Sequence, residues 1–177
     1  MTQLVFSFDV SRCSGCMACI VACQDQNDII SEATAFRRVS SLEESNETET
    51  DCQLSFLSMS CMHCGDAPCV MVCPAAAITK NEAGVVSVNR DLCIGCHSCE
   101  LACPFGAPQF AEDGKMAKCD FCHDRVEAGL LPACVRVCST KALGFGPLDE
   151  LTENKAKKAS TKIIRALLHK DHFEEKN

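Results

Sequence analysis

Cysteine is the residue type in this sequence best suited to chemistry. Seventeen of the 177 residues are cysteine, and sixteen of them fall into four groups of four. Each group opens with Cys-x2-Cys and closes with Cys-x3-Cys, where x is any residue. Thiols at such spacings bind iron–sulfur clusters or zinc, or they form disulfides. The groups are Cys13, Cys16, Cys19, Cys23; Cys61, Cys64, Cys69, Cys73; Cys93, Cys96, Cys99, Cys103; and Cys119, Cys122, Cys134, Cys138.

The spacing favours iron–sulfur clusters over the two alternatives. The first and third groups read Cys-x2-Cys-x2-Cys-x3-Cys, the ligand pattern of bacterial [4Fe–4S] ferredoxins, in which the fourth cysteine ligates the neighbouring cluster. Zinc sites usually separate their cysteine pairs by a dozen or more residues. Four repeats of one spacing would be unusual in a disulfide framework. We therefore expect [4Fe–4S] clusters, with zinc or disulfides as the less favoured alternatives.

The composition supports a metal-stabilised fold and argues against several classes of function. Hydrophobic residues make up 47% of the chain, but this figure includes all the cysteines, and there is no Trp or Tyr. The apolar core is therefore thin, and disulfides or bound metal must help to stabilise it. The net charge of −7 argues against nucleic-acid binding. We find no secretory signal of the chain's own and no apolar run long enough to span a membrane.

Short strands and helices between the cysteines predict a small α+β protein. We expect strands at 4–9 and 142–145, a helix at 19–26, a hairpin of 36–40 and 54–58 around an acidic loop at 43–51, and a second hairpin of 78–79 and 85–88. Residues 152–170 are rich in helix formers and predict a C-terminal helix.

The C-terminal segment differs in charge from the rest of the chain. Residues 1–151 hold 10 Lys and Arg against 20 Asp and Glu, a net charge of −10, whereas residues 152–177 hold 7 against 4, a net charge of +3. An apolar stripe runs along the predicted helix. We expect it to pack on the body or on a partner; binding to an anionic membrane surface is the alternative. The stripe consists of Ile163, Ile164, Leu167 and Leu168.

Several other residues near the cysteine groups could influence a cluster. Cys52 is the odd cysteine, and we expect it to be buried and inert rather than a spare ligand. His63 and His97 lie inside cysteine loops, where we expect them to surround a cluster or face solvent rather than ligate it. Five basic residues flank the groups; they either face solvent or raise the potential of a nearby cluster. They are Arg12, Arg90, Lys118, Arg125 and Arg136.

Longer motifs carry a resemblance to a known family. The order of the four groups, and above all the x2-x4-x3 spacing of the second, resembles the iron–sulfur subunits of the dimethyl sulfoxide reductase family of molybdopterin enzymes. The resemblance covers roughly residues 3–150. The matching segments are Phe36-Arg37-Arg38-Val39, Ser60-Cys61-Met62-His63-Cys64, Ala67-Pro68-Cys69, Cys103-Pro104-Phe105-Gly106-Ala107-Pro108-Gln109-Phe110, Lys118-Cys119-Asp120-Phe121-Cys122 and Gly144-Phe145-Gly146-Pro147.

The resemblance implies two ferredoxin-like units, one inserted in the other, around four [4Fe–4S] clusters. It places an outer unit at 1–30 and 111–150, a hairpin insertion at 31–58, an inner unit at 59–110 and a helical tail at 151–177. Pairing the groups by adjacency is the alternative, but 37 residues separate Cys23 from Cys61. Exchange of fourth cysteines then gives four ligand sets. The first set is Cys13, Cys16, Cys19, Cys138; the second is Cys23, Cys119, Cys122, Cys134; the third is Cys61, Cys64, Cys69, Cys103; the fourth is Cys73, Cys93, Cys96, Cys99.

The function implied by the resemblance is electron transfer without catalysis. The chain would relay electrons between a molybdenum or tungsten pterin catalytic subunit and a quinone, a cytochrome or another redox partner, with a membrane anchor as one candidate. A free polyferredoxin, or an electron carrier for a hydrogenase or formate-hydrogenlyase system, is the alternative. We expect a cytoplasmic or peripherally membrane-associated protein, or one exported together with its catalytic partner.

Overall fold

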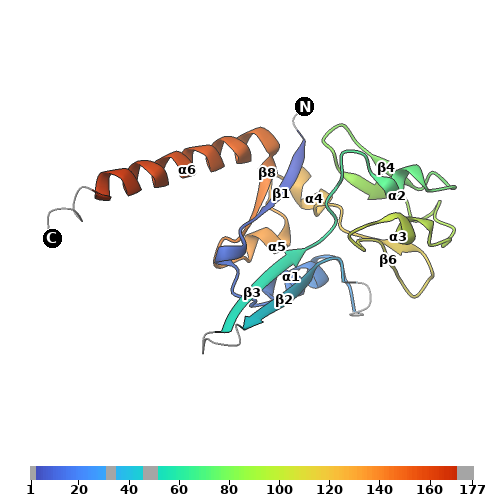
Figure 1. Cartoon of the computed structure of the whole chain (residues 1–177). Coiled ribbons are helices and arrows are strands. Elements are labelled where there is room, and N and C mark those ends of the chain that lie inside the picture. Colours follow the sequence, from blue (N-terminus) through green and yellow to red (C-terminus); the bar gives the residue numbers. More distant parts are fainter. Residues whose placement is uncertain (1–2, 31–34, 46–51, 171–177) are drawn as a thin grey trace.

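The computed structural model describes residues 3–30, 35–45 and 52–170, and it confirms the α+β expectation. Four separate two-stranded antiparallel sheets alternate with short helices along this part of the chain (Figure 1). The elements are β1 (Leu4–Phe8), η1 (Val10–Arg12), α1 (Ala18–Gln26), β2 (Arg38–Ser45), β3 (Cys52–Met59), α2 (Pro68–Met71), β4 (Ile78–Lys80), β5 (Val86–Val88), α3 (Ser98–Ala102), β6 (Gln109–Phe110), β7 (Met116–Ala117), α4 (His123–Glu127), α5 (Ala133–Arg136), β8 (Leu143–Pro147) and α6 (Leu148–Lys170).

The two ends of the cysteine-bearing region come together in one layer. Strand β1 pairs with β8, with Leu4 opposite Pro147 and Phe8 opposite Leu143. Helix α1 packs on α5, so the first and fourth cysteine groups become neighbours although 95 residues separate Cys23 from Cys119. Their small core contains two cysteines as well as apolar side chains, namely Cys19, Cys134, Val135 and Leu143.

The middle of the chain forms a second, similar layer. Strands β4 and β5 pair across the turn at 81–84, as predicted, and α2 packs on α3. The β6–β7 hairpin closes this layer, and Met116 of β7 is 1% exposed within its core. The core again mixes cysteine with apolar residues, namely Ala67, Cys69, Ile78, Val86, Cys99 and Met116.

The β2–β3 hairpin, which lies between the first and second layers in the sequence, is longer than expected. Strands β2 and β3 pair from Arg38 opposite Met59 to Ser45 opposite Cys52, so Glu43 and Glu44 belong to a strand and not to a loop. A two-stranded ribbon leaves one face in solvent, which lets polar residues occupy strand positions. The side chain of Cys52 and residues 46–51 lie outside the described part of the chain.

Helices α2 to α5 were not predicted, and their length explains why. Each has only four or five residues, too few for a hydrophobic period or for stability in isolation. Helices α1, α3 and α4 start directly after a residue with positive φ: Met17 at 63°, His97 at 60° and Cys122 at 54°. The cysteine loops therefore determine where these helices begin.

Helix α6 begins four residues earlier than predicted and projects away from the body (Figure 1). Its first turn contacts β1 and β8, and the Leu148 amide donates to the Gln3 carbonyl at 2.9 Å. The apolar stripe is exposed by 55–65%, so it does not pack on the body, and packing on a partner stays a prediction. In the described residues, no helix combines the length and apolar character needed to cross a bilayer.

Candidate metal centres

The cysteines line several cavities, and each cavity draws on distant parts of the sequence. None of the sixteen grouped cysteines forms a disulfide. Cys13, Cys16 and Cys19 lie in the loop before and at the start of α1, and together with Cys138, which follows α5, they line one cavity. Phe8, Val39 and Leu143 give this cavity apolar walls. These are the four cysteines of the first set.

A second cavity is lined by the third set. Cys61 and Cys64 come from the loop after β3, Cys69 from α2, and Cys103 follows α3. The walls include Val86, Pro108 and one charged side chain, Lys118. Cys103 belongs to the third cysteine group, in which it follows Cys99 by four residues. It nevertheless faces the loop of the second group.

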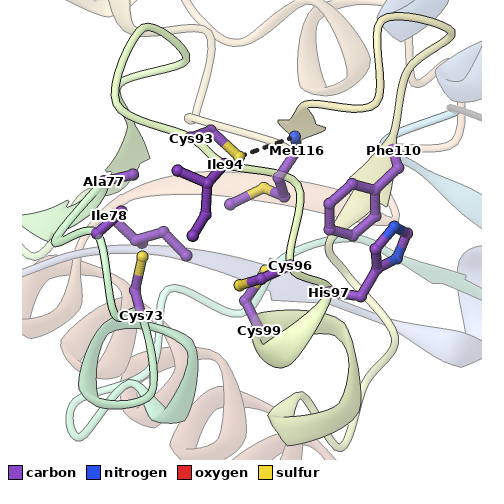
Figure 2. Close-up of a pocket in the computed structure, with 11 residues that line it drawn as sticks. Cys73, Ala77, Ile78, Cys93, Ile94, Cys96, His97, Cys99, Phe110 and Met116 are labelled. Carbon is purple, nitrogen blue, oxygen red and sulfur yellow. Dashed lines mark hydrogen bonds between the residues drawn. The ribbon is translucent and has the colours of Figure 1, made fainter.

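Figure 2 shows the cavity lined by the fourth set. Cys93 and Cys96 of one loop, Cys99 of α3 and Cys73 of another loop line this space, with Ile78 and Ile94 between them. The backbone amide of Met116 donates to Cys93 Sγ at 3.3 Å.

The cysteines of the second set lie close together in the interior. Burial raises the pKa of the Cys23 thiol to about 12, and the Cys134 and Cys122 thiolates add to that rise. Burial raises the pKa of Cys119 as well, and the Cys23 thiolate contributes. Like charges have such effects over a few ångströms. Cys23 of α1 and Cys134 of α5 therefore lie on two helices that pack together, and Cys119 and Cys122 are near enough to influence Cys23 or to be influenced by it.

Pairwise contacts or electrostatic effects link the first set to the second, the second to the third and the third to the fourth. Cys19 of the first set and Cys134 of the second belong to the same core cluster. Burial raises the pKa of Cys119 of the second set, and the Cys61 thiolate of the third set adds to the rise. Cys69 of the third set and Cys99 of the fourth again share a core cluster.

This geometry agrees with what the sequence comparisons find. Residues 52–148 match the family described as a 4Fe-4S dicluster domain, and residues 10–26 match a 4Fe-4S binding domain. All sixteen grouped cysteines lie inside these two ranges. The protein is 43% identical to a subunit of the anaerobic dimethyl sulfoxide reductase of Escherichia coli K12, over 99% of its own length and 87% of that subunit. It is 44% identical to the thiosulfate reductase electron transfer subunit PhsB of Salmonella typhi, over 84% of its own length and 78% of the relative.

The chain belongs to the iron–sulfur electron-transfer subunits of the dimethyl sulfoxide reductase family. The predicted family and the predicted role, electron transfer without catalysis, are thereby confirmed, and the cysteines are those of an iron–sulfur protein.

The surroundings of the sulfur atoms fit such clusters. Backbone amides donate to cysteine sulfurs in the third set, from His63 to Cys61 at 3.5 Å and from Ala107 to Cys103 at 3.4 Å. Hydrogen bonds of this kind favour the thiolate form that a cluster requires and tune its potential. Among the described residues, two buried side-chain nitrogens have no hydrogen-bond partner, Arg37 Nε and His63 Nε2. A sulfide-bearing cluster would bring acceptors into this interior.

His63 is fully buried, so of the two expected positions, beside a cluster or in solvent, the structure fits the position beside a cluster. Its ring stacks on Phe121 at 3.6 Å between centroids, and its Nδ1 accepts from the Val86 amide at 2.9 Å. Burial lowers its pKa to about 2, and the Lys118 ammonium adds to this. His63 is therefore neutral, with its proton on Nε2. His97, in contrast, is half exposed and contacts Glu100 and Phe110.

The basic residues divide into exposed and buried ones. Arg90 pairs with Asp113 at the surface at 2.5 Å, and Arg12 and Arg136 are exposed. Lys118 is only 4% exposed, so a solvent-facing role is wrong for it. Arg37 is 2% exposed and was not singled out as a site residue, because nothing in the sequence separates it from its exposed neighbour Arg38.

Proposed function

We propose that each of the four sets holds one [4Fe–4S] cluster, so that the chain carries four. The support is the grouping of the thiols: three cavities are each lined by four cysteines, and the second set accounts for the remaining four. In each set three members come from one cysteine group and the fourth from another, as an exchange of fourth cysteines requires. A bound [4Fe–4S] cluster would accept and release one electron at a time.

We also propose two nested ferredoxin-like units. The pairing of β1 with β8 and of α1 with α5 supports an outer unit made of the two ends, 1–30 and about 118–150. The pairing of β4 with β5 and of α2 with α3 supports an inner unit. Because β6 pairs with β7 and Met116 packs beside Ile78, the inner unit extends from about 59 to 117 rather than to 110. The β2–β3 hairpin is the insertion and α6 the tail.

The order of the sets supports a linear relay with two accessible ends. Cys16 of the first set and Cys96 of the fourth are exposed, whereas every described cysteine of the second and third sets is buried or half-buried. Electrons would therefore enter at one end set and leave at the other, while the interior sets are shielded from solvent. By analogy with the dimethyl sulfoxide and thiosulfate reductase relatives, we propose that one end faces a molybdenum or tungsten pterin catalytic subunit. The other end would face a quinone-reactive membrane subunit or another redox protein.

Co-purification tests this function. The tagged full chain, isolated without oxygen from its own host, should bring down a large subunit that contains pterin and about one molybdenum or tungsten per chain. A chain recovered in full yield, with all its iron and without such a subunit, would instead support a free polyferredoxin.

A further inference from the structure

Two cations are buried among the cysteine sets without a carboxylate to neutralise them. Arg37 is 2% exposed and Lys118 is 4% exposed. Within the part of the chain that the structure describes, neither forms an ion pair with Asp or Glu. An isolated buried charge is costly unless a negative charge compensates it. The fold therefore requires another source of negative charge beside each of these side chains.

The contacts of Arg37 place it at the junction of the first and second sets. Its guanidinium donates to Ser58 Oγ at 3.1 Å and to Ser60 Oγ at 2.9 Å, and it lies over the Phe6 ring at 4.9 Å. Ser58 Oγ in turn lies 3.4 Å from Cys19 Sγ of the first set, and Phe6 packs on the core cluster that contains Cys19 and Cys134. The guanidinium charge opposes the effect of burial on the pKa of three cysteines. These are Cys23, Cys119 and Cys134, all of the second set.

The contacts of Lys118 place it at the third set. The residue lines the cavity formed by the four cysteines of that set. Its Nζ donates to the Val86 carbonyl, and to the Cys119 carbonyl at 2.9 Å, which fixes the ammonium at the cavity wall. The charge opposes the burial-induced rise in the pKa of Cys69, a member of the third set.

We propose that Arg37 is the fixed counter-charge of the cluster in the second set and that Lys118 is the fixed counter-charge of the cluster in the third set. This inference rests on the proposed four-cluster relay. An oxidised [4Fe–4S] cluster with four thiolates carries about −2, and reduction adds a further negative charge. A nearby buried cation stabilises the reduced form more than the oxidised form, because the attraction grows with the charge of the cluster. Each cation therefore raises the reduction potential of its own cluster.

The effect of these two cations is greatest in the interior of the relay. Neither Lys nor Arg is among the described residues that line the cavities of the first and fourth sets. Asp120 acts against Arg37, because it adds to the rise in the pKa of Cys23 and Cys122. It is not paired with Arg37, and its Oδ1 accepts the Cys122 amide at 2.8 Å. The third set thus has its own buried cation, and the second set has Arg37 beside it. The first set lies one serine away from Arg37, and no described Lys or Arg lines the cavity of the fourth set.

Redox titration of the full chain, followed cluster by cluster by electron paramagnetic resonance, tests the proposal. Arg37→Gln should lower the midpoint of the second-set cluster by about a tenfold change in the reduction equilibrium, 59 mV for a one-electron couple, lower the first-set midpoint by less, and leave the fourth-set midpoint unchanged. Lys118→Gln should do the same to the third-set cluster. Lys80→Gln is the matched control, since exposed Lys80 lies beside the same third set, near Cys64, and its charge is screened by solvent. Unchanged midpoints in the two buried variants, an equal shift in all clusters, or the same shift in Lys80→Gln would overturn the proposal.

A charge-conserving variant keeps the test decisive if a neutral variant fails to assemble. Arg37→Lys should retain its iron and a midpoint near that of the wild type. A fall in its second-set midpoint as large as the one expected for Gln would show that the guanidinium acts through its shape, not its charge. Iron analysis of the wild type separates the two levels of the argument. Fewer than four clusters would contradict the proposed function, whereas four clusters with unmoved midpoints would contradict only the role of these cations.

Discussion

Gly95 offers a sharp test of how the cysteine loops are supported. It lies between Cys93 and Cys96 with φ at +69°, and a Cβ there would approach the Gly114 carbonyl oxygen to 2.6 Å. That oxygen belongs to the turn between β6 and β7, and the first residue of β7, Met116, donates its amide to Cys93 Sγ. Gly114 itself has φ at +72° with open space where its Cβ would lie. A Cβ added at either glycine would therefore be strained by the positive φ, but only a Cβ added at Gly95 would collide with another part of the backbone.

The magnitudes follow from this difference. A side chain at positive φ costs roughly 1–2 kcal/mol, which is the whole effect expected for Gly114→Ala. Gly95→Ala adds the displacement of a backbone turn, and forced overpacking costs about 1–3 kcal/mol more. The additional destabilisation should fall on the fourth set, because Gly95 is part of its loop.

The assay compares the two variants under the same anaerobic conditions. Visible absorbance of the clusters during a guanidinium titration gives the midpoint of unfolding, and iron analysis gives the clusters retained. Gly95→Ala should unfold at a clearly lower concentration than Gly114→Ala and lose about four iron atoms first, those of one [4Fe–4S] cluster. Equal midpoints and equal iron in the two variants would refute the support that we assign to the β6–β7 turn.

Three further predictions follow from the cysteine sets and the tail. Cys138→Ser should perturb the cluster held by Cys13, Cys16 and Cys19, and Cys23→Ser should perturb the cluster held by Cys119, Cys122 and Cys134. Electron paramagnetic resonance distinguishes the clusters. If Cys23→Ser altered the cluster of its own loop, the exchange of fourth cysteines would be contradicted. Removal of iron by a chelator should abolish cooperative melting in circular dichroism, because ligand binding and folding are coupled in such sites, and an unchanged melt would contradict this. Deletion of residues 152–177 should leave the iron content unchanged but weaken pull-down of the catalytic subunit. The deletion removes the exposed stripe of α6, while the first turn of the helix, which contacts β1 and β8, stays. Loss of iron in the truncated protein would show that α6 is part of the core instead.

The sequence was most informative where spacing alone determines chemistry. The sixteen cysteines could be singled out because tight repeats of Cys-x2-Cys have few other uses. Strands β1 and β4, helix α1 and the turn at 81–84 also follow from local patterns. The long β2–β3 hairpin was predicted too short, because Glu43 and Glu44 resemble loop residues until the solvent-facing ribbon is known.

The remaining features depend on tertiary contacts that no local pattern shows. Helices of four or five residues form because cysteine loops position them, and strands β6 and β7 of two residues have no period. Lys and Arg are normally solvated, so the burial of Arg37 and Lys118 becomes visible only when the cysteine sets assemble around them. The apolar stripe of α6 suggested that the helix packs on the body. Its contact with β1 and β8 instead directs the helix away from the body, and no local pattern in the sequence shows that contact.

Metal and sulfide analysis of the full chain, purified without oxygen, tests the central claim most directly. Four ligand sets that each hold a [4Fe–4S] cluster predict a brown protein with about sixteen iron atoms and about sixteen sulfide ions per chain. About eight of each, or stoichiometric zinc without visible absorbance, would contradict the four-cluster relay.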